Sequence, residues 1–137
     1  MDEQQTHGPL VTAREIAEAP EYRMQHPLNP NSEIHFRAFQ GMAMGELAGL
    51  KRLGVYTARI PPGRESFVYH RHHHEEEWMF VLSGRGVVEI GDAEHQIGPG
   101  DFVGFAALGP AHLVKNPFDA DLVILAGGER REMEVAD

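Results

Sequence analysis

The stretch that decides the fold is Pro62–Gly84, PGRESFVYHRHHHEEEWMFVLSG, in which four of the chain's nine histidines lie between positions 70 and 74. Residues two apart in a β-strand point to the same side, so His70 and His72 can both face one cavity. After a turn, the next strand can return Glu77 to that cavity. Two imidazoles and a carboxylate suit Fe, Mn, Ni, Cu or Zn far better than Mg or Ca. The stretch therefore predicts a transition-metal site between two neighbouring strands.

A fourth ligand is expected from a distant strand, and His112 is well placed for that role. It follows Gly109-Pro110-Ala111 and opens a run with β propensity. The competing interpretation is a solvated polar turn that takes up metal only as a purification tag does, and the strand parity of His70 and His72 argues against it. His35 stays open, because an N-terminal strand could bring it to the barrel mouth. We interpret the remaining candidates as turn, surface or packing residues: His7, His26, His73, His74, His95, Glu75 and Glu76.

Glu76 is the one serious rival to Glu77. Adjacent strand residues point to opposite faces, so only one of the two carboxylates can reach a metal inside the fold. Choosing Glu77 turns Trp78 outward. Choosing Glu76 would instead send three bulky residues, Trp78, Phe80 and Leu82, into a small interior that already holds three imidazoles, and overpacking is destabilising. We therefore expect Glu77 to be the ligand.

From Leu53 onward, the residue pattern of the chain is typical of an all-β fold. Short β-branched and aromatic runs alternate with turn residues such as Pro61-Pro62-Gly63 and Gly98-Pro99-Gly100. No helical period separates these runs, which argues against parallel βαβ units, and their spacing is typical of a sandwich or small barrel. The expected strands are 33–39, 55–60, 67–72, 77–82, 87–90, 94–97, 102–105, 112–115 and 122–126.

Composition excludes several classes of protein. The 137 residues contain no cysteine, which rules out disulfides, thiolate nucleophiles and Cys-ligated metal sites. Twelve basic against 21 acidic residues give a formal net charge of −9, a poor match for nucleic acid or anionic lipid. No apolar run approaches the roughly 20 residues that span a bilayer, and the polar N-terminus is unlike a secretory signal. We expect a cytoplasmic protein without nucleic-acid or membrane partners.

The first forty residues differ from the rest. Thr12-Ala-Arg-Glu15 is a capping box that predicts one short helix over Thr12–Ala19, which Pro20 would end. Pro20–Ser32 is rich in Pro and Asn and is expected to be an extended loop or arm. The division that we expect is therefore a tail, short helix and arm over 1–40, a barrel over 41–128 and a charged tail over 129–137.

Two motifs carry a family resemblance. The pattern Gly63, His70-x-His72-x4-Glu77-x6-Gly84 resembles the first motif of the cupins, with six residues in place of the usual five between Gly63 and His70. The pattern Gly109-x2-His112-x3-Asn116 resembles the second half of their second motif, with Ala107 where a proline is usual. The stretch Gly45–Gly54 also looks like a subgroup of small bacterial cupins, some of which are labelled as proposed sugar-phosphate isomerases.

This resemblance implies a double-stranded β-helix, which is an antiparallel jelly-roll barrel. It also implies that His70, His72, Glu77 and His112 are metal ligands. Such a set would leave two positions of an octahedron open, so a substrate could bind the metal directly, whereas a closed structural zinc site leaves none. The expected cofactor is one divalent transition metal, namely Fe, Mn, Zn or Ni.

Two functions fit these expectations. The first is a metal-dependent enzyme that acts on a small polar metabolite by isomerase, dioxygenase or lyase chemistry. The second is a non-catalytic cupin that binds or senses a small ligand. The complete ligand set favours the enzyme. No general acid or base is assigned, because Tyr56, Tyr69, Arg59 and Arg64 all fall near the expected cavity.

The outward face of the strand after the histidines is also informative. If Glu77 faces the cavity, Trp78, Phe80 and Leu82 face outward and are strongly apolar. Large exposed apolar patches usually mark interfaces. The alternative is packing under the chain's own N-terminal arm, and both can hold. We expect a homodimer.

Overall fold

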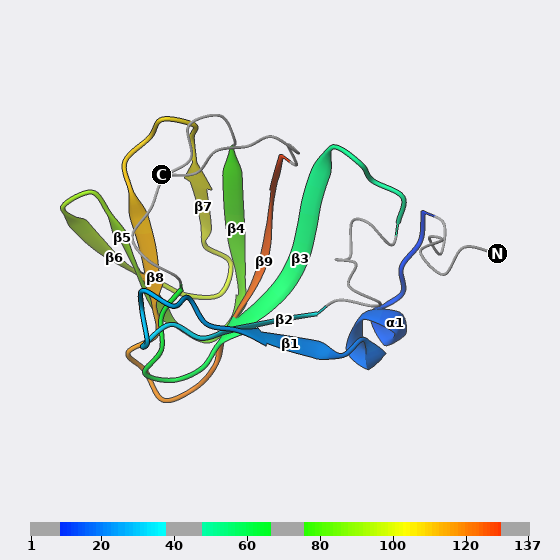
Figure 1. Cartoon of the computed structure of the whole chain (residues 1–137), viewed down its shortest axis with the longest axis horizontal. Helices are drawn as coiled ribbons and strands as arrows, with labels where there is room; N and C mark the ends of the chain where they lie inside the picture. Colours follow the sequence, from blue (N-terminus) through cyan, green and yellow to red (C-terminus); the bar gives the residue numbers. More distant parts are fainter. Residues whose placement is uncertain (1–8, 38–47, 67–75, 130–137) are drawn as a thin grey trace.

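The described part of the chain forms two antiparallel β-sheets and one short helix (Figure 1). This computed structural model describes residues 9–37, 48–66 and 76–129. The larger sheet has the strand order β1-β2-β3-β9-β4-β7, and the smaller has the order β6-β5-β8. The elements are α1 (Ala13–Glu18), β1 (Glu21–Met24), β2 (Ile34–Arg37), β3 (Leu53–Ile60), β4 (Glu77–Ser83), β5 (Gly86–Ile90), β6 (Ala93–Ile97), β7 (Phe102–Phe105), β8 (His112–Lys115) and β9 (Leu122–Glu129).

The core lies between the two sheets. Along β3 the buried residues are Ala58 and Ile60, and along β4 they are Met79 and Val81. The smaller sheet contributes apolar residues from each of its strands: Val88, Ile97 and Val114. Because side chains alternate between the faces of a strand, the residues between these positions point outward. The all-β jelly-roll expectation is therefore confirmed, and the expected short helix is present.

The helix forms where the capping box predicts it. Thr12 is the N-cap, its side chain accepts a hydrogen bond from the Glu15 backbone N–H, and the Glu15 carboxylate accepts one from the Thr12 backbone. Ala19 closes the helix, immediately before Pro20. The Arg37 guanidinium donates to the carbonyls of Ala17 and Ala19, at 3.2 and 2.8 Å, and so satisfies acceptors that the helix end leaves open.

The expectation of an extended loop or arm over Pro20–Ser32 was wrong in one part. Glu21–Met24 forms strand β1, which pairs with β2 in the register Tyr22–Phe36 and Met24–Ile34. The strand exists because β2 in turn pairs with β3, which offers an edge for a hairpin to extend. The described part of the arm therefore joins the larger sheet beside β3, with β3 and β9 between it and β4 (Figure 1).

The turn after β3 is tied to strand β8. Ser66 donates its backbone N–H to the Val114 carbonyl at 2.7 Å, and its hydroxyl accepts the Val114 N–H at 2.9 Å. Glu65 forms an antiparallel bridge with Lys115. The buried Asn116 amide donates to the carbonyls of Ile60 and Ala120, both at 2.8 Å. Glu65 and Ser66, the last described residues before the histidines, are therefore anchored to β8, the strand that carries His112.

Most of the other expected strands are confirmed to within a few residues. The strand expected over 67–72 lies outside the described residues, as do residues 1–8, 38–47 and 130–137. The three-part division of the chain stays a prediction. In the part of the chain that the structure describes, no helix is long and apolar enough to cross a membrane.

Candidate metal centre

Two of the four expected ligands converge from opposite sheets. The Nε2 atom of His112, at the start of β8, lies 3.9 Å from an Oε atom of Glu77, at the start of β4. The His112 side chain is only 9% exposed, whereas the Glu77 side chain is 31% exposed. An imidazole nitrogen and a carboxylate oxygen so close together form half of the donor set that transition metals prefer.

His112 is held by an aromatic neighbour. Its ring stacks on Phe105, with centroids 3.8 Å apart and an interplanar angle of 13°. Phe105 ends β7, opposite Glu77 in the β4–β7 ladder, and packs against the core. The same aromatic ring therefore lies beside both donors and orients the imidazole. Sequence reasoning gave Phe105 no role, because aromatic residues at strand ends commonly pack in the hydrophobic core.

Glu77 faces inward, as expected. It shares the face of the buried residues Met79 and Val81, while Trp78 lies on the other face and stacks on Phe102 with centroids 6.2 Å apart. The preceding residue, Glu76, is exposed, and its backbone N–H donates to the Glu129 carboxylate. The structure therefore agrees with the predicted register of this strand, and the identity of the ligand stays a proposal.

A glycine on the neighbouring strand makes room for Glu77. Gly128 of β9 pairs with Glu77, and a Cβ built on Gly128 would lie 3.2 Å from the Glu77 Cγ and 2.5 Å from the Glu76 carbonyl oxygen. Any residue with a Cβ at position 128 would therefore clash with Glu76 and Glu77. Glu77 can therefore pack directly over the β9 backbone.

Tyr56 is the described tyrosine nearest to the centre. On β3 it shares the inward face of Ala58 and Ile60, and it packs against the core. Burial raises the pKa of Tyr56 to about 12, and the nearby charge of Glu77 adds to that rise. The phenol therefore keeps its proton at physiological pH.

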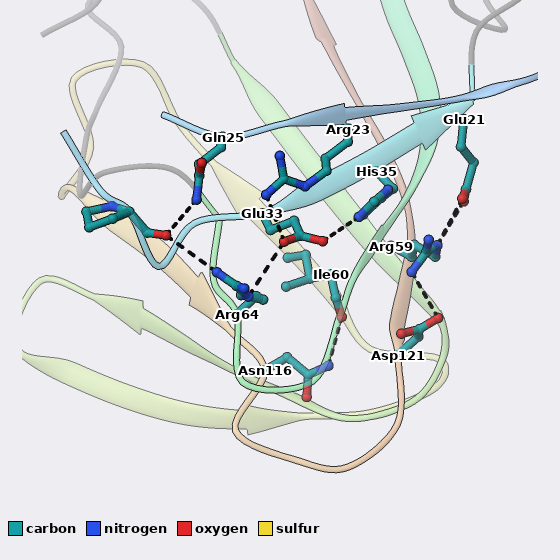
Figure 2. Close-up of polar contacts among 11 residues, drawn as sticks. Glu21, Arg23, Gln25, Glu33, His35, Arg59, Ile60, Arg64, Asn116 and Asp121 are labelled. Carbon is teal, nitrogen blue, oxygen red and sulfur yellow. Dashed lines mark hydrogen bonds and ion pairs between the residues drawn. The ribbon is translucent and has the colours of Figure 1, made fainter. Parts of the chain in front are cut away.

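The two arginines considered with Tyr56 have acidic partners elsewhere (Figure 2). Arg59 points to the outer face of β3, where it contacts Glu21 at 2.9 Å and Asp121 at 3.4 Å. Arg64 lies 3.6 Å from Glu33. The hydrogen bond to Arg59 lowers the pKa of Glu21 below its usual value. Neither arginine faces the interior beside Glu77.

His35 belongs to the same outer group. Its Nε2 atom lies 2.7 Å from Glu33, which also contacts Arg23 at 3.3 Å. The hydrogen bond to His35 and the Arg23 charge lower the pKa of Glu33. We call this group the outer charged cluster: Glu21, Arg23, Glu33, His35, Arg59, Arg64 and Asp121. Since His35 pairs with the outward-facing Arg59 in the β2–β3 ladder, it does not face the barrel interior.

The other two expected ligands, His70 and His72, lie outside the described residues, as do His7, His73, His74, Glu75 and Tyr69. Within residues 9–37, 48–66 and 76–129, no three His, Cys, Asp or Glu side chains form a group that could hold a metal. Of the remaining histidines, His26 accepts the Leu28 N–H in a turn, and His95 is exposed on β6.

The chain belongs to the cupin family. Residues 56–127 match the family model described as a cupin domain, and this span contains Glu77, His112 and both motifs named above. The match agrees with the two-sheet fold and with donors gathered between the sheets.

Two solved structures show the likeness over most of the chain. A proposed sugar phosphate isomerase from Acidithiobacillus ferrooxidans is 38% identical, with a TM-score of 0.85 over 93% of this chain and 79% of that one. A sugar phosphate isomerase of the cupin superfamily from Silicibacter pomeroyi is 28% identical, with a TM-score of 0.77 over 88% and 76% of the two chains.

A third structure is similar in fold alone. A proposed oxalate decarboxylase from Thermotoga maritima is 22% identical, with a TM-score of 0.68 over 85% of this chain and 96% of that one. No curated protein matches the chain.

Proposed function

We propose that the protein is a metal-dependent cupin enzyme that acts on a small polar metabolite, with His70, His72, Glu77 and His112 as ligands to one divalent transition metal. The observation that carries the proposal is the 3.9 Å approach of Glu77 and His112 from opposite sheets. A buried imidazole and a partly buried carboxylate fit Fe, Mn, Zn or Ni by donor type.

The register at the turn after β3 supports the other two ligands. Glu65 forms an isolated antiparallel bridge with Lys115, and Ser66 bonds to Val114, so residues 65 and 66 lie antiparallel to the end of β8. Residues opposite each other in an antiparallel ladder point to the same face. If a ladder continues in this register, His70 and His72 would share the face of Ser66 and His112, which is the barrel interior.

The ligand set defines what the site could do. A bound divalent metal would polarise a carbonyl or hydroxyl oxygen of a substrate at its open coordination positions. The protein would supply the rest: Phe105 stacks on the His112 ring and orients it, and Gly128 leaves space for Glu77. The names of the two solved structures that are 38% and 28% identical to this chain favour an isomerase of a sugar phosphate as the particular reaction.

Metal analysis of protein purified without a tag tests the proposal. We expect about one divalent metal per chain, and its loss in a His70→Ala, His112→Ala double variant that still folds. The purified metalloprotein would then be assayed for isomerisation of sugar phosphates and for oxygen consumption. Stoichiometric metal in the double variant would place the site elsewhere. A bound metal with no turnover of any substrate would favour the non-catalytic binder.

The outer face of the larger sheet supports a homodimer as part of this proposal. Trp78, Phe80 and Phe102 lie on that face, and Phe102 is 64% exposed. The chain has a formal net charge of −9, but the outer charged cluster on the same sheet contains three arginines and three carboxylates, so these charges balance locally. A second copy could therefore approach this face with little electrostatic repulsion. A cytoplasmic location stays a prediction from composition.

A further inference from the structure

We propose that Tyr56 is a ligand-binding residue whose hydroxyl donates a hydrogen bond to an oxygen atom of the small molecule at the metal centre. This inference rests on the proposed function, because it assumes a metal beside Glu77. It names a donor that neither the metal ligands nor the arginines supply.

The sheet register places Tyr56 beside the centre. Tyr56 pairs with Ala126 on β9, and Ala126 pairs with Met79 on β4. Two residues further along the same strands, Gly54 pairs with Gly128, and Gly128 pairs with Glu77 on the same inward face. Tyr56 is thus diagonal to Glu77 across a strand, and the positions between them carry only a methyl group or hydrogen. Although β9 separates the two strands, the Tyr56 phenol is near enough to Glu77 for that charge to contribute to the raised pKa of Tyr56.

The hydroxyl group is available to a ligand. Tyr56 is half-buried, and no other residue in the described ranges forms a hydrogen bond with its hydroxyl. A tyrosine hydroxyl in such surroundings usually has a hydrogen-bond partner, because an unsatisfied polar group is costly to bury. Solvent would fill that role without a ligand, and a ligand oxygen would replace it on binding.

The surroundings define the chemical class of the ligand. A protonated phenol donates to acceptor oxygens. The neighbouring Glu77 carboxylate would repel a free anion, but a metal bound to that carboxylate reverses the local field. The fitting ligand is therefore a small compound with two oxygens, one for the metal and one for Tyr56. Carboxylates, hydroxycarbonyl compounds and phosphate esters share this chemistry.

The experiment uses oxalate and inorganic phosphate as probes on the full-length, metal-loaded chain. Metal content is measured first, and probe affinity is then measured by calorimetry for wild type, Tyr56→Phe and Tyr22→Phe. Tyr22 is the matched control, because it lies on β1, is 41% exposed and stacks on Phe36. Tyrosine labelled with 13C at Cζ gives a second signal, assigned through the same variants.

We expect wild type and Tyr22→Phe to bind at least one probe with equal affinity. Tyr56→Phe should keep its metal and its melting temperature, but bind that probe about fivefold more weakly, as the loss of one neutral hydrogen bond implies. The probe should also shift the Tyr56 Cζ resonance and leave that of Tyr22 in place.

Equal probe affinity in Tyr56→Phe and wild type, at equal metal content, would overturn the inference and leave the proposed function intact. Metal-loaded wild type that binds neither probe would overturn it as well. Wild type that takes up no metal would contradict the proposed function itself and would remove the basis of this inference, and that result is read before any probe is added.

Discussion

Glu77 and His112, 35 positions apart in the chain, bring a carboxylate oxygen and an imidazole nitrogen within 3.9 Å of each other between the two sheets. Each residue opens its strand, β4 in the larger sheet and β8 in the smaller. The contact therefore joins the sheets at one end of the barrel, where the chemistry of the protein is expected.

The first prediction concerns which glutamate binds metal. Glu77→Gln should weaken the affinity for Mn²⁺ or Zn²⁺ at least tenfold, because an amide is a poorer ligand than a carboxylate for these ions. Glu76→Gln should change the affinity less than twofold, because Glu76 is exposed and on the opposite face. Titration calorimetry on tag-free protein measures both. The reverse ranking would mean that the strand register at the metal is shifted by one residue.

Metal binding should depend on pH. Neutral imidazoles bind metal and imidazolium groups do not, so protons compete with the metal as the histidines become charged. We expect affinity to be highest above about pH 7 and to fall progressively below about pH 6. Metal retained after dialysis across a pH series gives the curve. A flat response between pH 5 and 8 would argue against histidine ligands.

Replacing Gly128, which lies beside the metal centre, should destabilise the fold. In Gly128→Ala, the new Cβ would lie 2.5 Å from the Glu76 carbonyl oxygen, so backbone has to move. We expect a loss of roughly 1–3 kcal/mol in the free energy of unfolding, as for other overpacked sites. Gly98→Ala is the control, because no atom of the described residues lies within 4 Å of its Cβ position. Urea unfolding that shows equal stability for the two variants would contradict the packing described here.

The outer apolar face should determine the oligomeric state. Phe102→Glu puts a charge on a side chain that is 64% exposed in the single chain, so the fold should survive while self-association is lost. Leu28→Glu, on a loop residue that is 79% exposed, should leave the dimer intact. Light scattering at micromolar concentration measures the mass of each. A wild-type protein that is monomeric under these conditions would refute the homodimer.

The outer charged cluster should make stability depend on pH in the acid range. The pKa of Glu33 is lowered from 4.5, so its folded form holds the proton less tightly than the unfolded form. Its contribution is therefore complete above about pH 5.5 and is lost as pH falls through the folded-state pKa. At pH 7, Glu33→Gln should cost about 1 kcal/mol in the free energy of unfolding.

The difference between Glu33→Gln and wild type should shrink when urea unfolding is repeated near pH 3.5. Glu18→Gln is the control, because that side chain is 66% exposed and its ion pair with Arg14 lies on the same helix, so its effect should stay within about 0.5 kcal/mol. A constant difference for Glu33→Gln between pH 7 and pH 3.5 would show that its ionisation contributes nothing.

Local physics explains what could be predicted from the sequence. A strand has a period of two, so the order Glu77, Trp78, Met79 already separates an inner from an outer face once one residue is placed. The capping box at Thr12 and Glu15 needs only neighbouring backbone groups, and the helix begins where it predicts. The two spaced motifs were enough to predict the barrel.

Contacts between distant segments decided the rest. Strand β1 forms because β2 offers it an edge, and its residues Glu21–Met24 carry no strong strand signal between Pro20 and the Pro- and Asn-rich stretch that follows. Tyr56 and Arg59 looked equivalent, since apolar residues occur at both parities of that strand, and only the packing of two sheets turned one inward and the other toward Glu21 and Asp121. A periodic pattern fixes which residues share a face, but the partner of that face is set by the sheet that packs on it.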